Sequence, residues 1–169
     1  MNRMNWLTEL NENELPVVYA AALYDAALSA AKITDLFQAR AQTDASGDLY
    51  SPRLLKEVCA SLTRKHILKQ EIGIGLVLED GLRMTVILHM FRQGILRTWI
   101  AGIRDLLKRL GEYQYWKSYD GAFYGRELQF SVLSGRTDEA LLWREKLFSV
   151  KNLQGNLPAD KFFATDDGV

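Results

Sequence analysis

The side chains best suited to act on another molecule are cations grouped in the middle of the chain. Residues 51–109 carry eleven basic and five acidic groups, a local charge of +6, whereas residues 1–50 and 110–169 carry −4 and −2. The formal net charge is zero, so acidic flanks mask a basic middle. Because local potential attracts polyanions, this distribution favours a phosphate-binding surface within residues 51–109.

Residue types that perform covalent or metal chemistry are few. The single cysteine, Cys59, excludes an intramolecular disulfide, and two histidines are too few for a convincing zinc site. We interpret Cys59 as a core residue, His66 as a partner of the carbonyl end of its helix and His89 as a packed histidine. Gly73 and Gly75 lack the third glycine and the flanking elements of a nucleotide-binding loop. We therefore expect no enzymatic activity and no cofactor.

A helix over residues 51–66 is needed to position the cations. Ser51 is a typical N-cap residue, and Pro52 suits the first helical turn. Apolar residues at spacings of three and four predict a buried face of Leu54, Leu55, Val58 and Leu62. The opposite side carries Arg53, Lys56, Glu57, Ala60, Thr63 and Arg64. A plain solvated surface is the alternative interpretation of these charges, because any exposed helix carries such residues.

The neighbouring elements follow from changes in apolar period. The apolar spacing in residues 14–39 predicts a helix with a bend or turn near residues 27–31. Residues 43–50 contain Asp, Ser and Gly, which predict a loop. After His66 the pattern becomes extended, and two glycines predict a short hairpin over residues 67–78.

A sustained apolar stripe then predicts helix over residues 80–110. The stripe comprises Leu88, Phe91, Ile95, Trp99, Ile103, Leu106 and Leu110. We expect Asp80 to cap this helix, and Gly94 or Gly102 to mark a kink or a break between two helices. The spacing of four cations places them near one face of this helix: Arg83, Arg97, Arg104 and Lys108. We favour a solvent-exposed charged face over a second surface that contacts phosphates.

The C-terminal part predicts a helical hairpin. Two apolar-periodic segments, 119–133 and 137–147, flank the glycine turn Ser134-Gly135-Arg136, after an aromatic connector at 112–117. Residues 156–169 are expected to form a mobile tail. No uncharged apolar run of 18 residues exists and the N-terminus is acidic, so we expect a cytoplasmic protein without membrane contact.

The stretch from about residue 14 to 80 resembles a winged helix-turn-helix domain. The similarity lies in the order helix, helix, loop, the 51–66 helix in the recognition position, and a hairpin leading into Leu78-Glu79-Asp80-Gly81. In such domains the third helix enters the DNA major groove. The resemblance implies nucleic-acid contacts by Arg53, Lys56, Thr63 and Arg64, with Lys65 and Lys69 at the phosphate backbone. The hairpin tip has no Arg or Lys, so a minor-groove contact from it is not expected.

Residues 126–148 resemble one tetratricopeptide-type helical hairpin. The expected organisation is a mainly α fold with a winged helix-turn-helix domain at 1–80, one or two connecting helices at 81–110, a helical hairpin at 111–155 and a tail at 156–169. The expected function is DNA binding, with the C-terminal half used for oligomerisation or recruitment. The alternative is a protein-interaction module, either alone or as the N-terminal segment of a larger multidomain protein.

Overall fold

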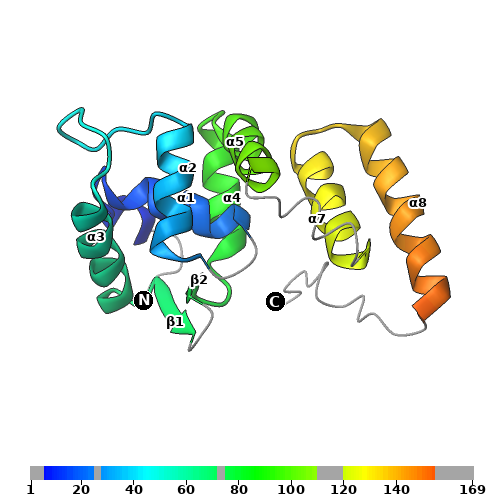
Figure 1. Ribbon diagram of the computed structural model, residues 1–169, viewed down its shortest axis with the longest axis horizontal. Coiled ribbons are helices and arrows are strands. Elements are labelled where there is room, and N and C mark those ends of the chain that lie inside the picture. The colour runs from blue at the N-terminus through cyan, green and yellow to red at the C-terminus, as the bar shows by residue number, and fades with distance from the viewer. Residues whose placement is uncertain (1–5, 25–27, 72–74, 110–119, 155–169) are drawn as a thin grey trace. The chain divides into compact units, whose positions relative to one another are not determined.

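The computed structural model describes residues 6–24, 28–71, 75–109 and 120–154, and the chain divides into two units, Met1–Leu106 and Leu107–Val169. The first part runs η1 (Trp6–Glu9), α1 (Glu14–Tyr24), α2 (Ala30–Ala39), α3 (Pro52–Arg64), β1 (Leu68–Glu71), β2 (Gly75–Leu78), α4 (Arg83–Arg92) and α5 (Leu96–Arg109) (Figure 1). The helices α7 (Asp120–Leu133) and α8 (Thr137–Gln154) follow. The predicted mainly α fold with one short antiparallel hairpin is confirmed.

Helix α1 is the centre of the first unit. It contacts α3, α4 and β2, and nearly all of its side chains are buried, including Val17, Val18 and Leu23. A helix that is apolar around its whole circumference must be covered on every side. The alanines of α1, Ala20 and Ala22, are fully buried and let the neighbouring helices approach closely.

The hairpin is tied to the segment between α1 and α2. Strands β1 and β2 pair antiparallel with Leu68 opposite Leu78 and Glu71 opposite Gly75. On the other side of β2, the Leu28 amide donates to the Leu76 carbonyl at 2.8 Å, and the Leu28 carbonyl accepts from the Leu76 amide at 3.0 Å. Leu28 therefore acts as a one-residue third strand that fixes the hairpin to the start of α2.

The caps of α2 and α3 follow from local sequence. Ser29 and Ser51 are in extended conformation, and their side chains accept bonds from the amides of Lys32 and Leu54. Ser51 followed by Pro52 was the predicted start of α3, and it is confirmed. The predicted loop at 43–50 is also present, folded around the Asp44 carboxylate, which accepts amide bonds within the loop.

The two helices end with the same hydrogen-bond pattern, although neither has a glycine there. The amides of Ala41 and Gln42 bond the carbonyls of Gln38 and Phe37. Those of His66 and Ile67 bond the carbonyls of Thr63 and Leu62. This Schellman pattern needs a left-handed residue, which is Ala41 in α2 (φ 49°) and His66 in α3 (φ 55°).

The expected helix over 80–110 is two helices, broken at Gly94 with a φ of 69°. Because the helix is broken, residues before and after Gly94 do not share one face. The prediction of a single buried stripe was therefore wrong for the residues on α4. Leu88 and Phe91 are 48% and 67% exposed, whereas Trp99 and Ile103 are buried. The expected cap was also wrong, because the N-cap position of α4 is Leu82, which makes no side-chain cap bond.

Gly102 continues α5 and is instead the site of a close approach. A Cβ atom there would lie 2.5 Å from a terminal nitrogen of Arg40. The Arg40 guanidinium lies 4.2 Å from the centre of the Trp99 ring and donates to the Thr98 carbonyl at 2.9 Å. Absence of a side chain at Gly102 thus lets Arg40 clamp the end of α2 onto α5.

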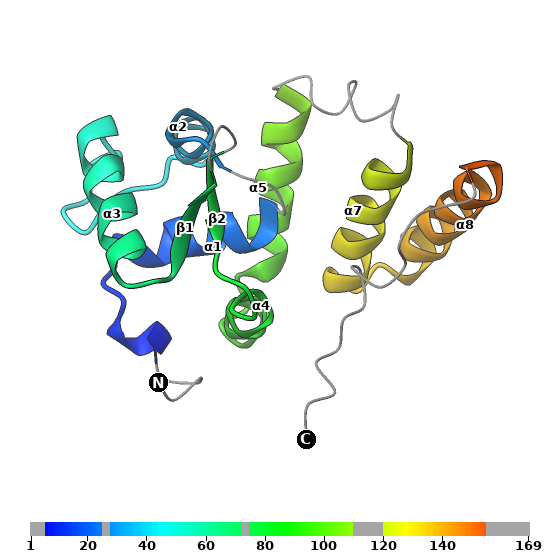
Figure 2. The same cartoon turned by 90° about the horizontal axis from the view of Figure 1, so that it is seen from below.

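The second unit is an antiparallel helical hairpin, as predicted, with α7 and α8 side by side (Figure 2). Gly135 turns the chain at φ 70°, and Trp143 of α8 packs against Phe123 and Tyr124 of α7. No helix among the described residues is long and apolar enough to cross a membrane. The predicted connector at 112–117 and tail at 156–169 lie outside the described residues.

Candidate nucleic-acid interface

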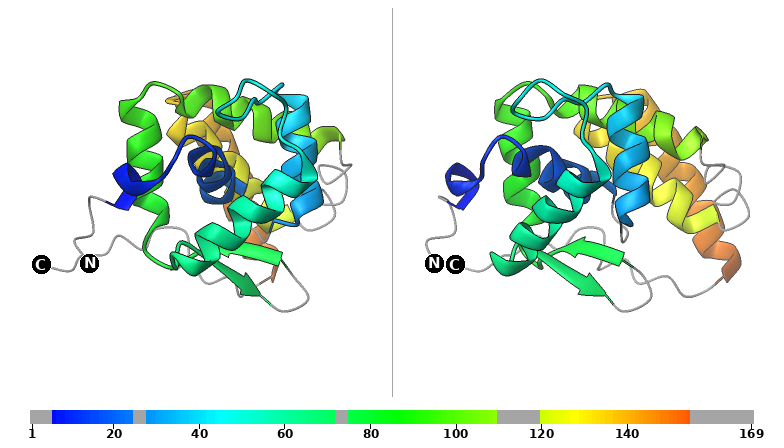
Figure 3. Two further views of the ribbon diagram at one scale, coloured as in Figure 1. Left: turned by 90° about the vertical axis from the view of Figure 1, so that its left-hand side faces the viewer. Right: turned by 60° about the vertical axis from the view of Figure 1, so that its left-hand side comes forward.

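Helix α3 lies at the outside of the first unit, and the hairpin continues from its C-terminal end (Figure 3). Its inner side packs into the core through Leu55, Val58, Cys59 and Leu62. Its outer side exposes Arg53, Lys56, Glu57, Ala60 and Arg64. The amphipathic division predicted from the sequence is present, except that Leu54 and Thr63 are both half-buried, so the helix offers a solvent-facing surface from Arg53 to Arg64.

Two cations on this surface are free to meet a ligand. Lys56 and Arg64 are exposed, and the side chain of neither makes a hydrogen bond or ion pair with any other described residue. At about 100° per residue, Arg53, Ala60 and Arg64 lie within roughly 40° of one line along the helix, with Lys56 roughly 60° to one side. The small Ala60 therefore lies between longer cationic side chains, an arrangement that lets a helix backbone approach a groove while the flanking cations reach its rims.

Arg53 is exposed but already paired. Its Nε donates to the Glu57 carboxylate at 3.0 Å, and the two side chains are 90% and 61% exposed. An exposed i,i+4 pair of this kind contributes only a few tenths of a kcal/mol. The pairing therefore neutralises the local charge at this point, but the pair is exposed and weak, so Arg53 can exchange Glu57 for a phosphate.

The remaining predicted contacts are used within the fold. Thr63 donates its hydroxyl to the Cys59 carbonyl at 2.9 Å, one turn back in its own helix. Lys69 pairs with Asp80 at 3.0 Å across the hairpin. Lys65 pairs with Glu14 at 2.7 Å. The structure thus brings the six predicted residues onto one helix and the following strand, but leaves only Lys56 and Arg64 without an intramolecular partner among the described residues.

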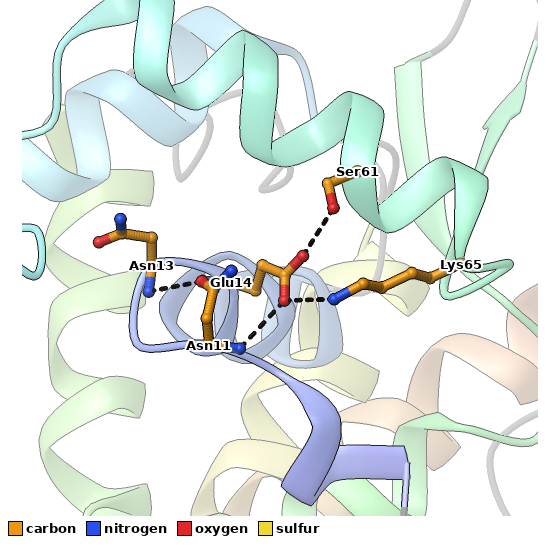
Figure 4. A network of polar contacts seen from close by, with 5 residues as sticks. All are labelled: Asn11, Asn13, Glu14, Ser61 and Lys65. Atoms are coloured by element: carbon orange, nitrogen blue, oxygen red, sulfur yellow. Dashed lines mark hydrogen bonds and ion pairs between the residues drawn. The ribbon is translucent and has the colours of Figure 1, made fainter.

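Glu14 is a buried charge next to α3, held by several polar contacts (Figure 4). It is 1% exposed and lies at the start of α1, where its Oε2 accepts from the Asn11 amide at 3.0 Å while the Asn11 side chain accepts from the Glu14 amide. This is a capping box. From α3, the Ser61 hydroxyl donates to Oε1 at 2.7 Å, and the Lys65 ammonium donates to Oε2 at 2.7 Å.

These contacts determine the ionisation of Glu14. Burial by itself raises the pKa of the carboxyl, but hydrogen bonds from Lys65, the Asn11 amide and Ser61, with the charge of Lys65, hold the pKa below its ordinary value. Glu14 is therefore an anion at neutral pH that joins α1 to the last turn of α3. It was not among the predicted site residues, and the sequence signal that points to it is the Asn11–Glu14 spacing of a capping box.

The expected second group of cations does not form one face. Arg83 is half-buried and donates its Nε to the Ala22 carbonyl at 2.8 Å, and Arg104 is buried. Arg97 is exposed on α5, beyond the break at Gly94. The predicted solvent-exposed charged face was wrong for Arg83, which lies on α4 before the break, and for Arg104, which is buried, whereas Arg97 and Lys108 are exposed on α5.

The residues considered for other chemistry are structural. Cys59 is buried, and burial raises the pKa of its thiol to about 11. His89 packs on Tyr19, with its Nε2 3.1 Å from the phenol oxygen. His66 meets the carbonyl end of α3 through its backbone amide. Among the described residues, no three His, Cys, Asp or Glu side chains are grouped to hold a metal ion.

Comparisons with protein-family models, with curated proteins and with solved structures find no match for this chain.

Proposed function

We propose that the first unit is a winged helix-turn-helix module that binds DNA through the outer face of α3. The observation that carries the proposal is the uncovered face with Lys56 and Arg64 free on either side of Ala60. A helix in the major groove needs such a face, with cations at the edges for phosphates and small residues where the backbone approaches the bases.

The arrangement of elements supports the same proposal. Two helices, a capped third helix and a hairpin occur in the order of a winged helix, and the Leu28–Leu76 bridge supplies the short strand between the first two helices. The N-terminal capping box and the Glu14–Lys65 pair hold α3 against α1. The rigid support of a recognition helix is what keeps its side chains in register with base edges.

The test is a fluorescence-anisotropy titration of a mixed pool of duplex DNA at several salt concentrations. We expect the Lys56→Ala/Arg64→Ala variant to bind more weakly, with a log-log salt slope smaller by roughly 1.8, because each lost phosphate contact removes about 0.9. A matched control removes two exposed cations of α5, Arg97→Ala/Arg109→Ala. Absent binding by the wild type, or equal losses in both variants, would contradict the proposal.

A protein-interaction module is the second candidate. The intramolecular pairing of Arg53, Lys65 and Lys69 lowers the positive field that DNA would meet. The helical hairpin also exposes large apolar side chains, Val132, Leu141, Leu142 and Phe148. Copurification from the native cell distinguishes the two functions, because this candidate requires a stoichiometric protein partner in the absence of nucleic acid.

A further inference from the structure

Helix α4 carries an apolar stripe that the first unit leaves uncovered. Met84, Leu88 and Phe91 are 55%, 48% and 67% exposed and follow one another at spacings of four and three residues. Side chains at such spacings lie on the same side of a helix. The opposite side of α4 is the one that packs into the core, through Val86, Ile87 and Met90. The helix is thus apolar on two sides, of which only one is used by the unit itself.

The charges at the two ends of this stripe are opposite. Before α4, Asp80 is 92% exposed, and its pairing with Lys69 leaves it at the surface. At the end of α4, Arg92 is exposed, and its side chain makes no hydrogen bond or ion pair with the described residues. One turn of helix separates Leu88 from Arg92, so the cation borders the stripe on the same side.

We propose that α4 pairs with α4 of a second copy of this chain, antiparallel about Leu88. In this arrangement Met84 of one copy lies opposite Phe91 and Arg92 of the other, and the long Arg92 side chain extends past Met84 towards Asp80, which precedes the helix. A parallel arrangement would bring like charges together at both ends. A two-fold axis makes the surface complementary to itself, which is the usual symmetry of a homodimer.

The expected dimer is weak and reversible. Three partly exposed side chains of this size cover roughly 300 Å² per copy, against about 800 Å² per partner in a stable interface of standard size. Residues bordering the stripe must supply the remainder, so we expect dissociation constants in the high micromolar range rather than an obligate dimer. This inference does not depend on DNA binding, because α3 and α4 present different surfaces.

The first experiment measures self-association of the full chain by sedimentation equilibrium over a wide concentration range. Leu88→Glu buries a charge at the centre of the pairing and is expected to weaken association at least tenfold. The matched control is Leu49→Glu, which changes a leucine of similar exposure, 59%, in the loop before α3. A wild type that stays monomeric throughout, or a dimer that survives Leu88→Glu, overturns the proposal.

The second experiment tests the antiparallel orientation by exchanging the charges. Asp80→Arg alone and Arg92→Asp alone each place like charges together, so each variant is expected to associate more weakly than the wild type. An equimolar mixture restores two attractive pairs and is expected to form a heterodimer at least as stable as the wild-type dimer. Retained self-association of both single variants, or no recovery on mixing, excludes this orientation and overturns the proposal.

Circular dichroism of each variant, recorded at low concentration, shows whether the fold is retained. Asp80→Arg also removes the partner of Lys69, but that pair is exposed on the Asp80 side and contributes little. Association that is lost in a folded Leu88→Glu variant and unchanged in Leu49→Glu supports the pairing on α4. Equal losses in both variants assign the effect to added charge and contradict it.

Discussion

The two sides of α3 use the same type of side chain differently. Lys65, at the inner edge, donates to the buried Glu14 carboxylate at 2.7 Å, whereas Lys56, on the outer face, is exposed and has no partner among the described residues. Both lysines belong to the basic middle of the chain, residues 51–109, and each adds one positive charge to its net charge of +6. The difference teaches that the charge available to a ligand is set by which cations the fold itself requires.

The largest expected effect concerns the inner side. Leu62→Ala removes a fully buried side chain and should destabilise the first unit by about 3 kcal/mol, through lost burial and a residual cavity. Lys56→Ala on the outer side should stay within about 0.5 kcal/mol of the wild type. Urea titrations followed by circular dichroism compare the two. Similar losses in both variants would show that the outer face is not a solvent surface.

The second effect concerns the Glu14 anion. Glu14→Gln should cost about 2 kcal/mol at neutral pH, because it replaces a charged acceptor of three hydrogen bonds in a buried position. The matched control is Glu12→Gln, an exposed residue of the same capping segment. An equal loss of stability in Glu12→Gln would show that the buried contacts of Glu14 do not stabilise the fold.

The same contact predicts how stability changes with pH. Since folding lowers the pKa of Glu14, its contribution is fully present above the pKa of the unfolded chain and is lost as the pH falls through the folded pKa. The stability difference between wild type and Glu14→Gln should therefore shrink below about pH 4.5, near the ordinary pKa of a glutamate. Urea titrations at a series of pH values measure it, and a difference that stays constant down to pH 2 would contradict the assignment.

The direct comparison of the two lysines should give a smaller effect. Lys65→Met leaves Glu14 without its counter-ion, and we expect a loss of about 1 kcal/mol because the Lys65 side chain is 38% exposed and water replaces part of the interaction. Lys56→Met should be near neutral in stability and should weaken DNA binding instead. Thermal unfolding and anisotropy titration of both variants would separate the two roles, and a reversed pattern would refute the comparison.

The smallest effect is a gain at the end of α3. His66→Gly should stabilise the unit by about 0.5 to 1 kcal/mol, because the residue is left-handed and glycine adopts that conformation without a Cβ penalty. Ala41→Gly should behave alike at the end of α2. Thermal unfolding measures both, with Gly94→Ala expected to show the opposite sign. Destabilisation by either glycine would indicate a further contact of the replaced side chain.

The parts of the fold that were predicted correctly rest on local chemistry. Ser51 and Pro52 start α3, paired glycines favour a hairpin, and Gly135 ends a helix, each within a few residues of its effect. The sequence predicted the break between α4 and α5 only as one alternative to a kink, and only at Gly94 or Gly102. Apolar residues continue at helical spacing across Gly94, although the helix itself does not continue.

Of the candidate site, only the features that depend on α3 alone could be predicted from the sequence. The division of α3 into two faces follows from periodicity, and it places Lys56 and Arg64 correctly on the exposed side. The partners of Lys65 and Lys69 lie on other elements, and for Lys65 the partner Glu14 is 51 residues away in the sequence. No local pattern states that such a pair forms, so tertiary packing decides which cations remain available.

Cys59 gives the chain an internal reporter for the movement of α3. Its thiol is the only one in the sequence, is buried beside the core face of the helix, and has a pKa raised to about 11. A protonated, inaccessible thiol reacts slowly with alkylating reagents. The labelling rate of the native protein therefore measures how often α3 separates from the core, without any introduced probe.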